Sequence, residues 1–246
     1  MKSPQEVEIL RIANTIVMEI LLTLKEEVKP GKSTFEFEER AIELCEKKKV
    51  IPAFKGYRGY PYALCISINE EIVHGMPRKD KVLKEGDIVS FDFGVIYEGY
   101  YGDAALSVGV GKISETAERL LKATEEALSL AIEKARIGNK IGDISFAIQD
   151  RVERDGFNVI RDFVGHGIGR ALHEPPEIPN YGRPGRGPKL EAGMVLAIEP
   201  MVSAGSWEVE ILEDGWTAVT KDRSLACHFE HSVAITPSGP KILSKI

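Results

Sequence analysis

The sequence predicts an α+β fold in which two pseudo-symmetric helix-helix-strand halves surround a central antiparallel sheet. The order of segments is the first indication, because two helices followed by strands occur early in the chain and the same order begins again later. An internal repeat is the second. KPGKSTFEFEERA aligns with RIGNKIGDISFAI (Gly31 with Gly138), and LKEGDIVSFDF aligns with LEAGMVLAIEP (Gly86 with Gly193), both at an offset of 107 residues. A constant offset in two separate segments indicates two related halves.

Four helices are predicted, two in each half. Apolar residues recur at helical spacing over residues 4–28, and Ser33 and Thr34 then cap a second helix that continues to Val50. In the second half Ser114 caps a long helix, and a Gly-Asn turn precedes another capped helix in IGNKIGDISFAIQDRVERDG. The helices therefore repeat in the same order as the aligned segments.

Strands follow the first two helices. Residues 62–69 and 87–96 are rich in β-branched and alternating apolar residues, which is typical of strands. The run FDFGVIYEGYYGD continues the second strand into a tight turn at residues 97–99 and an antiparallel partner. A loop of two or four residues would place Asp92 and Asp103 on one face of this hairpin, whereas a loop of three would separate them.

Length and charge predict a single domain that spans residues 1–246, with its two halves at about 1–110 and 111–246. With 43% hydrophobic residues the chain can bury a large core. A net charge of -6 gives no general attraction to nucleic acid or anionic membranes. The segment MKSPQEVEILRIAN has charges every few residues where a signal peptide needs an unbroken apolar core, and no apolar run approaches the length of a membrane span. We therefore expect a cytoplasmic monomer without a membrane or specific nucleic-acid partner.

The cysteines do not suggest a thiolate metal site. Cys45, Cys65 and Cys227 cannot all pair, and none of them stands in a CxxC motif. An odd number of isolated cysteines is typical of a reducing compartment. We expect all three to be buried free thiols.

A carboxylate inside a strand built for burial is the first sign of a functional site. An ionised carboxylate that leaves water costs several kcal/mol unless a cation or several donors meet it. Asp92 is such a residue, and the 107-residue offset aligns it with Glu199 in the equally apolar predicted strand MVLAIEPMV. If the halves pack around a pseudo-twofold axis, the two carboxylates meet near it. The alternative for the hairpin alone is a strand aspartate held by backbone donors and a solvent-exposed aspartate near a turn.

Three more residues extend this set. His166 lies between glycines in DFVGHGIG, Glu230 interrupts CHFEHSVAIT, which is predicted to be the final strand, and Asp103 follows the hairpin turn. Together with Asp92 and Glu199 they would gather about four negative charges, which two divalent cations would balance. Oxygen-rich ligation with one imidazole suits Mn, Fe, Co or Zn, and the residues do not select one of them.

The same segments resemble a known family. FDFG with GYYGDAA, FVGHGIGRALHEPP, MVLAIEPM and CHFEHSV, in this order and spacing, closely resemble the type I methionine aminopeptidases of the pita-bread fold. The resemblance covers essentially the whole chain. It implies hydrolytic removal of N-terminal methionine from nascent proteins and peptides whose second residue is small.

The resemblance also implies a role for each site residue. In the implied dinuclear centre Asp103 and Glu230 lie between two metal ions, Asp92 binds one ion through both oxygens, and His166 and Glu199 complete the other. Glu199 would also carry the proton of the attacking water. The implied substrate contacts are His74 near the leaving amide nitrogen, His173 near the scissile carbonyl oxygen, and a methionine pocket formed by Tyr57, Tyr60, Cys65 and Trp216.

Three features depart from the family pattern or stay open. Leu172 stands where relatives often carry an aromatic residue, which affects the expected shape of the pocket. His228 stands two residues before Glu230, at a position where a glutamine is usual. If both residues lie on one strand, their side chains share a face of the sheet. His228 would then either approach the metals or line the pocket wall. The basic segment NYGRPGRGPKL is predicted to be a solvated loop, with contact to ribosomal RNA as the alternative.

Two other functions compete with this interpretation. An Xaa-Pro peptidase of the same fold would share the metal ligands, although such relatives usually carry a separate N-terminal domain. A metal-free binding module on this fold would have lost ligands, whereas all five positions are present here.

Overall fold

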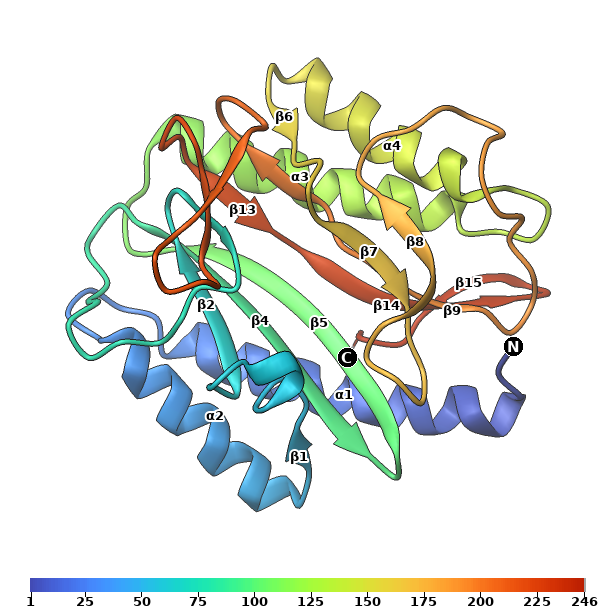
Figure 1. Ribbon diagram of the computed structural model, residues 1–246, viewed down its shortest axis with the longest axis horizontal. Coiled ribbons are helices and arrows are strands. Elements are labelled where there is room, and N and C mark those ends of the chain that lie inside the picture. The colour runs from blue at the N-terminus through green and yellow to red at the C-terminus, as the bar shows by residue number, and fades with distance from the viewer. Residues whose placement is uncertain (246) are drawn as a thin grey trace.

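In the computed structural model, which describes residues 1–245, four α-helices pack on a curved antiparallel sheet (Figure 1). The helices are α1 (Pro4–Glu26), α2 (Thr34–Lys48), α3 (Glu115–Lys134) and α4 (Ile141–Arg154), and a short 3₁₀ turn, η1, spans Tyr57–Gly59. The earlier strands are β1 (Ile51–Pro52), β2 (Leu64–Ile68), β3 (Glu71–Val73), β4 (Ile88–Tyr97) and β5 (Tyr100–Gly109). The later strands are β6 (Asn158–Val159), β7 (Val164–Gly167), β8 (Glu174–Pro179), β9 (Val195–Ile198), β10 (Met201–Ser203), β11 (Val209–Ile211), β12 (Ala218–Thr220), β13 (Ala226–His228), β14 (Glu230–Thr236) and β15 (Gly239–Ile242).

The central sheet has nine strands, and its order brings distant parts of the chain together. Its main path is β1-β4-β5-β14-β9-β7-β8, with β2 paired to β4 and β15 paired to β14. Two three-stranded sheets, β13-β10-β6 and β11-β12-β3, lie beside it. All of these pairs are antiparallel, as predicted. Strands of the first half and the second half meet where β5 pairs with β14.

The helices begin where the sequence predicts and end slightly earlier. Ser33 caps α2 and Ser114 caps α3: each side-chain hydroxyl accepts a hydrogen bond from the backbone N–H of the residue three positions later in the chain. Such a cap typically contributes about 1 kcal/mol to stability. The first helix ends at Glu26 rather than residue 28. The second ends at Lys48, because Lys49 adopts a left-handed backbone conformation (φ 56°) that a helix cannot continue through.

The 107-residue offset relates backbone contacts as well as residue types. In each half, the turn before the second helix exchanges hydrogen bonds with a segment that precedes a central strand. In the first half, Leu83 N–H donates to Lys32 O (2.9 Å) and Gly31 N–H donates to Leu83 O (2.8 Å). In the second half, the equivalent bonds run from Leu190 N–H to Asn139 O (2.8 Å) and from Gly138 N–H to Leu190 O (3.4 Å). Every partner pair is displaced by the same offset, so the two segments have the same local geometry.

Two apolar cores lie under the two helix pairs. In one, α1 and α2 pack on β2, β4 and β5; in the other, α3 and α4 pack on β9, β10, β13 and β14. Figure 1 shows the helix pairs on opposite sides of the long β5 and β14 strands. The three cysteines are buried free thiols, as predicted. Among residues 1–245, no helix combines the length and apolarity that crossing a membrane requires.

The hairpin between β4 and β5 settles the loop length that the sequence left open. Tyr97 pairs with Tyr100, so the loop has two residues, Glu98 and Gly99, and both have positive φ, as tight hairpin turns require. Asp92 pairs with Ala105, and Asp103 pairs with Gly94. Because the partners differ by two positions, the two aspartates share one face of the ribbon.

Two predicted strands are each divided into two, which corrects the sequence interpretation. The segment MVLAIEPMV forms β9 and β10 in different sheets, and Glu199 and Pro200 lie between them. Pro200 has no N–H for a sheet hydrogen bond, so the ladder breaks there. Similarly, CHFEHSVAIT divides at Phe229 into β13 and β14, and β15 rather than β14 is the final strand.

Candidate metal centre and active site

All the residues that the sequence analysis assigned to the site line one cavity. Its volume is about 150 Å³, and one side of it is acidic whereas the other is aromatic. A larger groove of about 1070 Å³ adjoins it and shares His74, Asp92 and His173 with it. The predicted residues in the smaller cavity are Asp92, Asp103, Glu199, Glu230, His74, His166, His173, Tyr57, Tyr60, Cys65 and Trp216, together with Leu172.

The acidic side is built by neighbouring strands of the central sheet. Asp92 lies in β4, Asp103 in β5, Glu230 at the start of β14, and His166 in β7, while Glu199 directly follows β9. These strands are consecutive in the order β4-β5-β14-β9-β7. The sheet therefore converts five positions spread over the chain into one row of side chains.

Ligand atoms of three side chains in this row lie within reach of a common ion. One ligand atom each from Asp103, His166 and Glu230 lies within 4.8 Å of the other two. The Nε2 atom of His166 is 3.9 Å from Asp103 Oδ2 and 3.5 Å from Glu199 Oε1. Asp103, His166 and Glu230 are each at most 6% exposed, so little water is available to solvate their charges.

Several of these atoms have no hydrogen-bond partner among residues 1–245. They are Asp92 Oδ1, Asp103 Oδ1 and Glu230 Oε1, all fully enclosed. A buried carboxylate oxygen without a donor is costly, and a divalent cation removes that cost. His166 Nδ1 lies 2.9 Å from Gly167 O; a carbonyl only accepts, so Nδ1 carries the proton and Nε2 keeps its lone pair for a ligand. The donor set thus fits a divalent metal.

Burial controls the protonation of the carboxyl groups. It raises the pKa of Asp92 to about 7, although its side chain is only half-buried at the cavity wall. Burial also raises the pKa of Asp103 and of Glu230 well above the ordinary range, and neighbouring carboxylates add to both shifts. Burial raises the pKa of Glu199 well above its ordinary range too. Without a cation, the cluster therefore favours bound protons.

The two substrate histidines of the sequence analysis stay neutral at pH 7. Burial and the nearby imidazoles of His228 and His173 lower the pKa of His74 to about 4. The pKa of His173 is also lowered to about 4, by loss of water within the cavity, by His166 and by Arg58, even though part of its side chain is exposed. Each ring can therefore act as a neutral hydrogen-bonding group.

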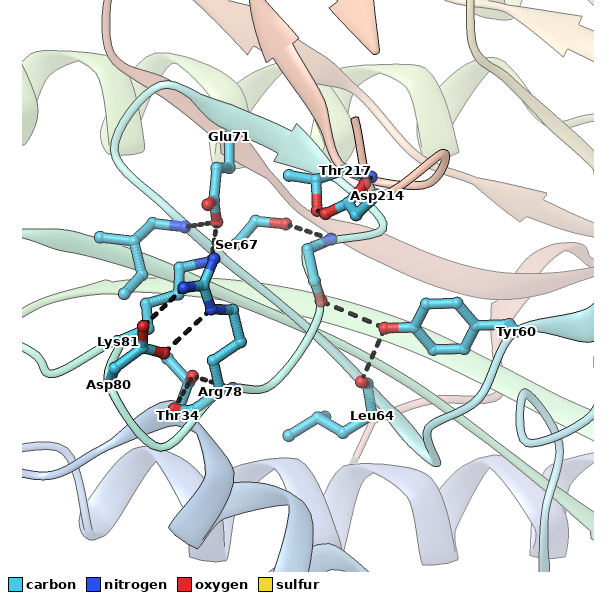
Figure 2. A network of polar contacts seen from close by, with 12 residues as sticks. Thr34, Tyr60, Leu64, Ser67, Glu71, Arg78, Asp80, Lys81, Asp214 and Thr217 are labelled. Atoms are coloured by element: carbon cyan, nitrogen blue, oxygen red, sulfur yellow. Dashed lines mark hydrogen bonds and ion pairs between the residues drawn. The ribbon is translucent and has the colours of Figure 1, made fainter. Parts of the chain in front are cut away.

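The backbone holds His74 in an uncommon conformation. Its φ is 59°, in the left-handed region, and its ring stands edge-on to Phe163 at 5.3 Å between centroids. The next residue, Gly75, is pinned to β2: its carbonyl accepts from Ile66 N–H (2.8 Å) and from the Tyr60 hydroxyl (3.1 Å), and its N–H donates to Ser67 Oγ (3.2 Å). Figure 2 shows the bonds from Tyr60 and Ser67 that hold this loop.

Gly75→Ala should therefore displace His74. An added Cβ would lie 2.3 Å from the backbone oxygen of Ile66, which cannot move without distorting β2. If His74 has the role that the resemblance implies, a small displacement of its ring is costly, and we expect kcat to fall at least about tenfold with the chain still folded. Peptide turnover and a melting curve measure the two effects, and turnover within twofold of the wild type would show that this contact does not position His74.

The aromatic side of the cavity gathers the predicted methionine pocket. Tyr60 is 3% exposed and stands edge-on to Trp216, with 5.1 Å between ring centroids. Cys65 in β2 pairs with Asp92 in β4, so the thiol side of the pocket adjoins the acidic side. Leu172 is buried in the same apolar cluster.

His228 lies at the acidic side, although the reason given from sequence was wrong. His228 ends β13 and Glu230 begins β14, so the two are not neighbours on one strand. The His228 Nε2 atom is buried, 3.4 Å from Glu199 Oε2, and has no hydrogen-bond partner within residues 1–245. It thus faces the carboxylate whose other oxygen approaches His166.

Three other residues in contact with the site were not predicted from the sequence. Phe54 and Arg58 line the cavity, and Phe163 contacts His74. Arg58 stands in the run YRGY between two predicted pocket residues, which was a usable signal. Nothing in the local pattern around Phe54 or Phe163 distinguishes them from ordinary core residues.

A curved antiparallel sheet that gathers buried carboxylates and a histidine beside a small pocket is an arrangement suited to metal-dependent hydrolysis. The model of Metallopeptidase family M24 matches residues 8–237. A methionine aminopeptidase of Clostridium perfringens is 54% identical over 246 residues, covering 100% of this chain and 98% of that protein. The crystal structure of a methionine aminopeptidase from Thermotoga maritima superposes with a TM-score of 0.98 at 52% identity and covers 100% of this chain and 98% of the other.

The chain belongs to metallopeptidase family M24, and within it to the methionine aminopeptidases. It is a hydrolase that uses divalent metal, and the α+β pita-bread fold predicted from sequence is confirmed. A prolidase of Pyrococcus furiosus shares the fold at lower similarity, with a TM-score of 0.79 and 26% identity, and this chain covers 65% of it.

Proposed function

We propose that the protein removes N-terminal methionine by hydrolysis from nascent proteins and peptides whose second residue is small. The observation that carries this proposal is a single cavity of about 150 Å³ in which an acidic side that suits a metal ion meets an aromatic side. Tyr60, Cys65 and Trp216 would enclose the methionine side chain. The adjoining groove would receive the rest of the substrate, because it shares His74 and His173 with the cavity.

We further propose that five residues hold two divalent ions. Asp103 and Glu230 would lie between the ions, Asp92 would serve one of them, and His166 and Glu199 the other. Support comes from the enclosed oxygens of Asp92, Asp103 and Glu230 and from the free lone pair of His166 Nε2. Bound ions supply acidified water and polarise the scissile carbonyl. Mn, Fe, Co and Zn all suit this donor set.

The remaining chemistry would fall to three side chains. Glu199 would accept a proton from the attacking water and pass it to the leaving amine, as a general base and then a general acid. His74 would hydrogen-bond near the leaving nitrogen. His173 would donate a hydrogen bond to the carbonyl oxygen as negative charge develops on it.

The organisation of the protein is part of the proposal. We propose that residues 1–246 form one catalytic domain with halves at about 1–110 and 111–246, supported by the contacts that repeat at the 107-residue offset. The protein would act as a monomer in the cytoplasm. The exposed arginines of the basic loop at residues 180–190, Arg183 and Arg186, keep ribosome contact open as a further expectation.

Metal titration of the wild-type protein tests this function. We expect the metal-free protein to bind two Mn(II) or Co(II) ions per chain in calorimetry and to hydrolyse Met-Ala-Ser only after metal addition. Ala-Pro peptides serve as the control, because a prolidase activity would prefer them. Preference for Ala-Pro would favour an Xaa-Pro peptidase, and a chain that binds no divalent ion would favour a metal-free binding module.

A further inference from the structure

Three aromatic rings form a column beside the acidic cluster. His166 and His173 are in contact, with 4.2 Å between ring centroids. Tyr57 also stacks on His173, with 5.2 Å between ring centroids and an interplanar angle of 29°. The rings come from η1, from β7 and from the residue before β8, so three separate segments fix the column.

The two imidazoles in this column meet different kinds of partner through the same nitrogen. His166 Nδ1 faces a backbone carbonyl, which can only accept, so its proton must be on Nδ1. His173 Nδ1 lies 2.8 Å from the hydroxyl of Tyr57, which can donate. If the hydroxyl donates, the two neighbouring rings have opposite tautomers: His166 has a free lone pair on Nε2, and His173 has a proton on Nε2.

We propose that the Tyr57 hydroxyl donates to His173 Nδ1 and thereby holds His173 in the tautomer that carries its proton on Nε2. Tyr57 is then a positioning residue as well as a pocket wall. The proposal rests on the role of His173 proposed above: a donor at Nε2 attracts a carbonyl oxygen that gains negative charge, whereas a lone pair there repels it. The opposite bond direction, with Tyr57 accepting, would leave His173 without its donor.

Nitrogen NMR tests the tautomer without any turnover. Protein labelled with ¹⁵N at histidine is loaded with Zn(II), which is diamagnetic, and His173 is assigned by its loss in His173→Asn. We expect Nδ1 of His173 to have the shift of an unprotonated nitrogen and Nε2 that of a protonated one. In Tyr57→Phe, which keeps the ring and removes only the hydroxyl, both shifts should move toward a mixture of tautomers. A wild-type spectrum with the proton on Nδ1, or no change in Tyr57→Phe, would overturn the proposal.

Kinetics and a matched variant complete the test. Loss of one hydrogen bond predicts a fall in kcat of about two- to tenfold in Tyr57→Phe, with KM changed less than twofold. Tyr60→Phe is the spectroscopic control: it removes a hydroxyl from the same pocket, but that hydroxyl bonds to Leu64 O and Gly75 O, so the His173 shifts should stay unchanged. Equal movement of those shifts in both variants would contradict the assignment. A different result would contradict the proposed function: a wild-type protein that does not hydrolyse methionine peptides, whatever the tautomer of His173.

Discussion

Glu199→Gln is expected to leave a folded protein whose turnover of Met-Ala-Ser is at least about 100-fold lower. The side chain is enclosed between His166 Nε2 at 3.5 Å and His228 Nε2 at 3.4 Å, one on each carboxylate oxygen. The amide has nearly the same size and keeps one oxygen, but it cannot accept and return a proton. It also removes one negative charge that would hold the metal. Single-turnover rates at saturating metal measure the loss.

Glu71→Gln is the matched control for this variant. The Glu71 side chain is 13% exposed, as is that of Glu199, and it binds Lys81 and Ile68 N–H away from the cavity. Loss of the Glu71 carboxylate should lower the stability of the fold and leave turnover per folded molecule near the wild-type value. If Glu199→Gln retained wild-type turnover while its circular dichroism spectrum stayed native, Glu199 would be neither the base nor a needed ligand.

The clustering of the acidic residues was predictable from the sequence where chemistry and spacing agree. Asp92 was identifiable because an ionised carboxylate conflicts with an apolar strand, and the constant offset then led to Glu199. For Asp92 and Asp103, the sequence left only the length of the hairpin loop open. The structure has a two-residue turn at Glu98 and Gly99, which places the two aspartates on the same face. Such conflicts between local pattern and residue type are expected at functional sites.

The parts that could not be predicted depend on the order of strands in space. The sequence pattern continued straight through Pro200 and Phe229, where the chain leaves one sheet for another. For the same reason the contact between His228 and Glu199 was not derivable, since β13 and the segment after β9 meet only in the fold. The bond between Tyr57 and His173 joins residues 116 apart in the chain, and no spacing rule reaches across that distance.

Without metal, the free energy of unfolding should fall as pH rises from 7 to 8. Burial raises the folded-state pKa of Asp92 to about 7 and that of Glu230 well above its ordinary range, whereas both titrate near 4 in the unfolded chain. The folded state then binds more protons than the unfolded state. A raised carboxyl pKa gives stability that is present at low pH and lost as pH rises, by up to about 1.4 kcal/mol per pH unit for each extra proton. Urea unfolding at each pH, with chelator present, measures this slope.

Glu230→Gln separates the contribution of the acidic cluster to the pH dependence of stability from that of other titrating groups. This variant removes one of the crowded carboxylates, so its metal-free form should be more stable than the wild type at pH 8 and should show a shallower slope. With saturating Mn(II), the wild type should become more stable than the variant. The bound ion balances the ionised carboxylates of the wild type and stabilises its folded state by mass action, whereas the variant has lost a proposed ligand. A variant that is less stable than the wild type without metal would mean that Glu230 makes a favourable contact in the metal-free fold. That result would contradict the argument that its enclosed oxygen is suited to a cation rather than to the protein alone.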